Sequence, residues 1–173
     1  MIYLATNAPD VYRKKHLNYI FIDTAKATDG SGYNWVRIMT SVDFAIAYNP
    51  NSISRDYISY ATPSVELDSY RPQLKQTQTA IIGDPIYDFI ADMARNQATG
   101  FDAVTNMMIV TQNKDADGNE LAYMCEVLIT IDTDDYVAAT ITYSIDQRGD
   151  RTYGTATVRD NMPTFVPAVS VAP

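Results

Sequence analysis

One acidic segment of the chain has spacing close to that of a calcium-binding loop. Asn113, Asp115, Asp117 and Gly118 match the first, third, fifth and sixth positions of that template. Its twelfth position, however, is Met124, where a bidentate glutamate is required, and the flanking residues alternate as strands do rather than as helices do. The pattern therefore favours a plain β-turn over residues 113–119, with its tight point at Asp117-Gly118.

A second acidic cluster, Asp132, Asp134 and Asp135, could also attract a hard cation. It lies between two alternating segments, where acidic side chains are usually just hydrated, so we predict a solvated turn here and no metal or cofactor site in the chain.

The sequence gives little reason to expect a site for nucleophilic or acid–base catalysis. His16 is the only histidine and lies in a charged N-terminal segment, so a histidine zinc site or a Ser/His/Asp triad in the core is not expected. Cys125 is the only cysteine, and its apolar neighbours predict a buried structural thiol. No phosphate loop or dinucleotide fingerprint is present, and nothing singles out a catalytic pair among the 21 acids. We therefore expect a protein that is not an enzyme.

The net charge of −8 lies almost wholly in the second half of the chain. Residues 1–100 carry 9 Lys and Arg against 10 Asp and Glu, whereas residues 101–173 carry 4 against 11. Stable binding to DNA needs a positive charge instead, because affinity comes largely from cations that neutralise phosphates.

The N-terminus lacks the order of a secretory signal and no apolar run could span a bilayer, so we expect a protein made in the cytoplasm that does not bind membranes.

One amphipathic helix is predicted over residues 84–96. Asp84 can cap it and Pro85 suits the first helical position. Its apolar residues fall on one stripe with helical spacing, namely Ile86, Phe89, Ile90, Met93 and Ala94. The helix carries no chemistry of its own and is expected to cover a sheet.

Alternating apolar and polar residues predict strands elsewhere. The expected strands are residues 19–24, 36–48, 73–82, 105–111, 121–131, 137–146 and 152–159, with turns at 132–135 and 147–150. We predict a single, mainly β domain over residues 1–173. It is expected to be an antiparallel β-sandwich or barrel-like subunit with one packed helix, an N-terminal arm at 1–18 and a proline-rich C-terminal tail at 160–173.

Residues 49–72 form a connection that is unusually long and apolar for a loop. Three prolines interrupt any strand ladder, yet the segment carries Ile53, Tyr57, Ile58, Tyr60, Val65 and Leu67. One interpretation is a small edge hairpin folded on its own sheet. The other is an intersubunit arm ordered by a neighbouring copy.

The strand positions opposite the predicted core are rich in hydroxyls and mildly acidic. They are Ser41, Asp43, Thr77, Thr79, Glu126, Thr130, Thr140, Thr142, Ser144 and Asp146, with Lys75 as the exception. Such a wall repels phosphates, so DNA could slide along it without binding. An ordinary solvated sheet face would have the same composition.

The order of these parts resembles the major tail tube proteins of long-tailed bacteriophages over residues 35–154. The most specific stretches are QTQTAIIGDPIYDFI at residues 76–90 and TITYSIDQRGD at residues 140–150. The resemblance implies a structural subunit that forms hexameric rings stacked into a tube for DNA passage. Its partners would be further copies of itself and the tape measure, baseplate and terminator proteins, and its location would be the virion tail after assembly in the host cytoplasm.

The same resemblance places residues 49–72 in ring-to-ring contacts and the hydroxyl-rich strand faces along the lumen. Two alternatives stay open: another head–tail or baseplate protein of this fold, and a carbohydrate-binding β-sandwich that would use some of the 13 tyrosines as a sugar platform.

Overall fold

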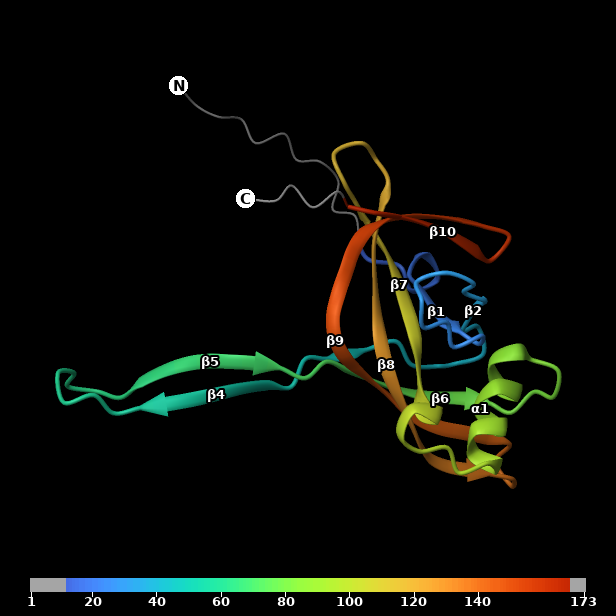
Figure 1. The fold of residues 1–173 in the computed structure, drawn as a ribbon, viewed down its shortest axis with the longest axis horizontal. Helices are drawn as coiled ribbons and strands as arrows, with labels where there is room; N and C mark the ends of the chain where they lie inside the picture. The colour runs from blue at the N-terminus through green and yellow to red at the C-terminus, as the bar shows by residue number, and fades with distance from the viewer. Residues whose placement is uncertain (1–11, 169–173) are drawn as a thin grey trace.

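The computed structural model describes residues 12–168 and is built around one eight-stranded antiparallel sheet, with a two-stranded hairpin that extends far from it (Figure 1). The main sheet contains β1 (Tyr19–Asp23), β2 (Trp35–Arg37), β3 (Ile46–Ala47), β6 (Gln73–Thr79), β7 (Val104–Lys114), β8 (Glu120–Asp135), β9 (Thr140–Arg159) and β10 (Met162–Pro167). The hairpin pairs β4 (Pro50–Arg55) with β5 (Ser64–Tyr70). The prediction of a mainly β fold with one helix is confirmed.

The sheet curves so that its two edges approach each other, and the segment between β2 and β3 connects them. Strand order is β2-β1-β7-β8-β9-β6-β3, with β10 pairing β9 beside it, so the edge strands β2 and β3 are consecutive in sequence. Between them the backbone changes partners: Ile38 donates to Ile20 of β1, whereas Val42 donates to Thr77 of β6. This nearly closes the sheet into a barrel.

The single long strand predicted over residues 36–48 is therefore wrong. Its alternation is real, but the chain must leave one sheet edge and join the other, and it cannot stay straight while doing so. Val42 and Tyr48, two of the apolar residues in that alternation, are 65% and 48% exposed and do not point into a core.

The two longest strands, β8 with 16 residues and β9 with 20, run where turns were expected. β8 continues through residues 132–135 and the chain turns only at 136–139, while β9 passes through 147–150 without ending. β-Bulges at Met124/Glu126 and at Ile131/Thr133 absorb the strain of this curvature. Polar, glycine-containing residues at 147–150 thus form a bend within a strand, not a connection between two strands.

The helix α1 (Pro85–Arg95) follows its prediction closely. The Asp84 carboxylate accepts from the backbone N–H groups of Ile86 and Tyr87, at 2.9 and 3.4 Å. Ile86, Ile90 and Met93 are buried against the concave face of the sheet. A buried polar chain also ties the helix start to the sheet: the Tyr143 hydroxyl donates to Gln78, Gln78 donates to Thr40, and Thr40 donates to Asp84.

Apolar side chains fill both faces of the sheet. The larger cluster lies between the concave face and α1, and the smaller lies on the opposite face at the far end, where Phe21, Trp35 and Met108 pack with Phe165 of β10. Gly154 makes this packing possible, because a Cβ there would overlap the backbone oxygen of Val166. β10 is thus a packed part of the fold, although the sequence suggested only a proline-rich tail.

The predicted N-terminal arm lies outside the described residues for positions 1–11. Its remaining part, which includes a short 3₁₀ helix η1 (Lys15–Leu17), lies against the body: the Lys15 ammonium donates to the carbonyl of Val42 at 3.0 Å.

Candidate interaction surfaces

The β4–β5 hairpin is the most unusual surface of the molecule. It leaves the body at residues 48–50 and 70–72 and extends sideways from the sheet (Figure 1). Every residue of β4 is exposed, and every residue of β5 except the half-buried Ser64. The interpretation of a hairpin folded back on its own sheet is therefore wrong, and the hairpin has no packing partner within the described chain.

Strand register divides the hairpin into two unlike faces. Val65 pairs with Ser54 and Leu67 with Ser52, so two apolar side chains stand among small hydroxyls on one face. Ile53, Arg55 and Glu66 share the other face, where the Arg55 Nε lies 3.4 Å from a carboxylate oxygen of Glu66. The first face has apolar groups and no charge, so it is the face better suited to burial.

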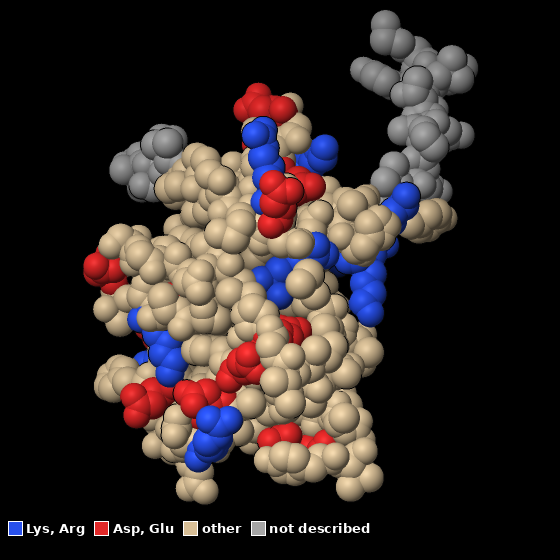
Figure 2. Space-filling view, turned by 90° about the vertical axis from the view of Figure 1, so that its right-hand side faces the viewer, with Lys and Arg blue, Asp and Glu red and all other residues tan. Residues whose placement is uncertain are grey.

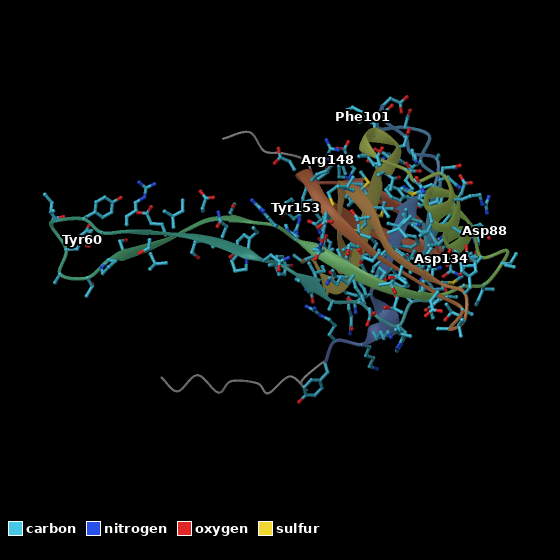
Figure 3. All side chains as sticks on the ribbon, turned by 90° about the horizontal axis from the view of Figure 1, so that it is seen from below. Tyr60, Asp88, Phe101, Asp134, Arg148 and Tyr153 are labelled. Carbon is cyan, nitrogen blue, oxygen red and sulfur yellow. The ribbon has the colours of Figure 1, made fainter. Side chains whose placement is uncertain are left out.

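The tip of the hairpin is aromatic. Tyr57 and Tyr60 stack edge to face with ring centroids 5.9 Å apart, and Ile58 is fully exposed between them. Tyr60 lies near the end of the hairpin that is away from the body (Figure 3). All six side chains predicted for an intersubunit arm thus lie on this projection, three at its tip and three along its strands.

The hydroxyl-rich face is also assembled largely as expected. Register places Thr77 opposite Thr142, Thr79 opposite Thr140, and Thr130 opposite Ser144. Asp146 and Glu126 fall on the same side of the sheet, because they occupy positions of the same parity in β9 and β8. Eight of the ten predicted positions therefore share one face of β6, β9 and β8.

Ser41 and Asp43 do not belong to this face. They lie in the segment that changes sheet edges, where Ser41 forms an isolated bridge opposite Gln78, a residue buried on the concave side. Asp43 is exposed and its N–H donates to the Ser41 hydroxyl. The alternation that suggested them is not continued by a straight strand.

Partners within the sheet neutralise part of the charge on the hydroxyl-rich face. Arg148 Nε lies 2.9 Å from a Glu126 oxygen and offsets its charge, whereas the neutral Gln73 amide only donates a hydrogen bond to Asp146, at 2.8 Å. Ser144 is buried and donates to Asp132. Thr79 and Thr130 are exposed on this face, and the other three threonines are half-buried. The face is consequently more nearly neutral than its sequence suggested.

A groove of about 1000 Å³ lies at the root of the hairpin, lined by Tyr48, Tyr70, Gly149, Asp150, Arg151 and Tyr153. The Arg151 guanidinium stacks on Tyr123, 4.4 Å from the ring centroid, and its Nε donates to Gln147 at 2.8 Å. Arg148 and Tyr153 lie on the side of the body from which the hairpin leaves (Figure 3). Sequence reasoning missed this cluster because the expected turn at 147–150 separated residues that one strand carries.

The aspartates of the two acidic segments accept hydrogen bonds from backbone N–H groups of the turns in which they lie. Asp115 accepts from the backbone N–H and the side-chain amide of Asn119, which chiefly lower the pKa of its carboxyl, and from the backbone N–H of Asp117. The predicted turn is confirmed, since β7 ends at Lys114 and β8 begins at Glu120. Asp135 likewise accepts from Val137 and Ala138. Across residues 12–168, no three His, Cys, Asp or Glu side chains gather in a way that could hold a metal ion.

On the side of the molecule away from the hairpin, acidic and basic side chains are interspersed over a mostly uncharged surface (Figure 2). None of the helices described is long and apolar enough to cross a bilayer.

Cys125 is buried in the larger core cluster, and burial raises the pKa of its thiol to about 12. Because the reactive species is the thiolate, we expect iodoacetamide at pH 8 to leave Cys125 unmodified in the folded protein and to modify it fully in denaturant. Intact-mass spectrometry after timed labelling measures both. Labelling of the native protein at the rate of the unfolded chain would contradict this burial.

Neither the scan of protein-family models nor the search of curated proteins gives a match. Among solved structures, one similar chain comes from "Cryo-EM structure of the anti-feeding prophage (AFP) baseplate, 6-fold symmetrised". The alignment covers 84% of this chain and 95% of that chain, with 9% sequence identity and a TM-score of 0.42. A structural similarity with so low an identity and TM-score assigns no function to this chain.

Proposed function

We propose that this chain is a structural subunit of a phage tail, which assembles into hexameric rings that stack into a tail tube for DNA passage. The observation that carries the proposal is the β4–β5 hairpin, which has both faces exposed and apolar groups at Val65, Leu67 and the aromatic tip. An isolated two-stranded hairpin is marginally stable in water. A neighbouring copy that covers it would supply the missing packing.

The length of the projection suits a contact between rings. A hairpin that reaches beyond its own body can contact the next ring, whereas contacts within a ring need only the sides of the body. Its apolar face, with Val65 and Leu67, is the part that we assign to the contact surface.

The hydroxyl-rich face supports a role as lumen wall. Five threonines lie on it, exposed or half-buried, and the charge of Glu126 is partly offset by Arg148. The face therefore offers no row of free cations to hold phosphates, and DNA would pass along it without stable contacts. In this arrangement the strands β6, β8 and β9 face the channel.

Negative-stain electron microscopy of the purified protein over a range of concentrations tests the proposal. We expect rings with six-fold symmetry, or tubes built from them, and sedimentation velocity should show large species that grow with concentration. A strict monomer at all concentrations would overturn the proposal. A monomer that also bound glycans on an array would favour the carbohydrate-binding alternative, whereas closed rings that never stack would favour a baseplate or head–tail role.

A further inference from the structure

A pocket of about 580 Å³ lies between the segment that precedes β1, the segment between β2 and β3, and strand β7. Its charged lining residues, in the described part of the chain, are both basic: Arg13 and Lys15. The Lys15 ammonium has only a backbone carbonyl as its partner, and neither cation forms an ion pair within residues 12–168. The apolar lining residues are Val42, Phe44, Ala45, Ile46 and Ile109. This basic pocket thus combines apolar walls with a positive rim.

Two adjacent turns at the end of the sheet form an exposed apolar surface, the turn patch. One turn joins β6 to α1 and the other joins β8 to β9, and the N–H of Ala80 donates to the carbonyl of Ala139 between them at 2.9 Å. Ile82, Tyr136 and Val137 are 91%, 87% and 99% exposed. Side chains this exposed pack against almost nothing in their own chain, so a partner could bury nearly all of their apolar area.

The turn patch has an acidic rim. Asp88 accepts from a backbone N–H of the β6–α1 turn at 3.3 Å, and a hydrogen bond to Asp134 raises the pKa of the Tyr136 hydroxyl, so both carboxylates lie beside the patch. Figure 3 shows Asp88 and Asp134 on the side of the body away from the hairpin. Arg95, the cation of α1, pairs with Asp92 at 3.6 Å, and no cation among residues 12–168 forms an ion pair with Asp88 or Asp134.

We propose that the turn patch of one copy docks in the basic pocket of a second copy. The two surfaces are complementary in both apolar character and charge, because exposed Ile82 and Val137 meet apolar walls while the acidic rim meets Arg13 and Lys15. The net charge of −8 opposes self-association in general, so contact between copies is favoured where a basic surface is available.

This contact joins two different surfaces of the chain and is therefore heterologous. Every pair keeps one unoccupied basic pocket and one unoccupied turn patch, so further copies can add until a ring closes. Placing the contact within a ring rests on the proposed function, since the rotation between successive copies decides between a closed ring and an open filament. Neither surface includes a residue of β4 or β5, so the hairpin remains available for contact between rings.

Charge exchange in the full chain tests the contact. Arg13→Glu with Lys15→Glu should weaken self-association by about tenfold or more, because it places carboxylates opposite carboxylates. Adding Asp88→Lys and Asp134→Lys to the same chain should restore most of the affinity, because the two signs are then exchanged. Sedimentation velocity over a concentration series measures each association, and circular dichroism checks that each variant is folded.

The matched control adds Asp29→Lys and Asp117→Lys to the pocket variant instead. Both aspartates are exposed and lie in other loops, so the net charge changes equally while the turn patch stays acidic. We expect no restoration from this pair. Equal restoration would overturn the proposal, because net charge alone would then explain the result. Unchanged self-association of the pocket variant would overturn it as well.

A second measurement locates the contact directly. A chain with Val137→Cys and a chain with Ala45→Cys should be joined by a short bismaleimide when they are mixed, whereas either chain alone should not cross-link. Cys125 is buried and does not compete. Rings or tubes that form without this cross-link would overturn the contact and leave the proposed function standing. Cross-linked, charge-sensitive assemblies that never close into rings would support the contact and contradict the proposed function.

Discussion

Deletion of Ile53–Leu67 is expected to abolish polymerisation and leave the subunit folded. The removed residues contribute nothing to either apolar cluster of the body, and their side chains are exposed apart from the half-buried Ser64. They do include all six side chains that we assign to contact with a neighbouring copy. The deletion therefore removes the proposed interface without opening the core.

The geometry of the hairpin makes this deletion conservative. The deletion joins Ser52 to Asp68. Ser52 lies opposite Leu67, the last residue removed, and Asn51 lies opposite Ser69, so the two ends are already close across the ladder and an inserted Asn-Gly pair can close a short turn between them. Circular dichroism and a thermal melt should match those of the intact chain, while electron microscopy and sedimentation should show no tubes. Normal tubes from the deleted chain would refute the assignment of this hairpin.

Point variants locate the contact within the hairpin. Val65→Ser with Leu67→Ser changes only the apolar face and should weaken assembly strongly, because it removes apolar area that a partner would bury. Arg55→Ser with Glu66→Ser, on the opposite face, removes an exposed ion pair and is the matched control, for which little change is expected. The reverse outcome would assign the contact to the other face of the hairpin.

The sequence predicted correctly those features that depend on residues close together in the chain. The helix at Pro85–Arg95 has its cap, its proline and its apolar stripe within a dozen residues, and the turn at Asp115–Asn119 is closed by one carboxylate. The hydroxyl-rich face followed from the two-residue period of the strands, whose register then brought eight residues together. Each of these features depends on neighbours in the sequence or on the pleat alone.

Other features depend on strand pairing between segments distant in sequence, so a short stretch of sequence could not predict them. Residues 38–45 alternate like a strand, yet they connect opposite edges of a nearly closed sheet, which only the complete strand order reveals. Residues 147–150 look like a turn, yet β8 on one side keeps them in a strand and a bulge absorbs the bend. The groove at the hairpin root was missed for the same reason, because its residues come from three separate strands and their ends.

Asp23 is another such residue, and Asp23→Ala is expected to destabilise the fold far more than any of the hairpin substitutions. Its side chain is fully buried at the end of β1. One oxygen accepts from the backbone N–H groups of Ala25 and Asn34, and the other accepts from Ala27 and from the side-chain amide of Asn106. One carboxylate thereby organises the loop that joins β1 to β2.

Alanine at this position leaves three backbone amides without their acceptor, and an unsatisfied buried donor costs about 1–3 kcal/mol. The loop is exposed over residues 28–32 and can partly open to water, which recovers some of that cost. We therefore expect the free energy of unfolding to fall by about 3–5 kcal/mol, measured by urea denaturation at pH 7. Asp29→Ala is the matched control from the same loop: Asp29 is exposed and accepts from Ser31, so its loss should leave the urea midpoint nearly unchanged. If the two variants had equal midpoints, Asp23 would not be the residue that holds this loop to the sheet.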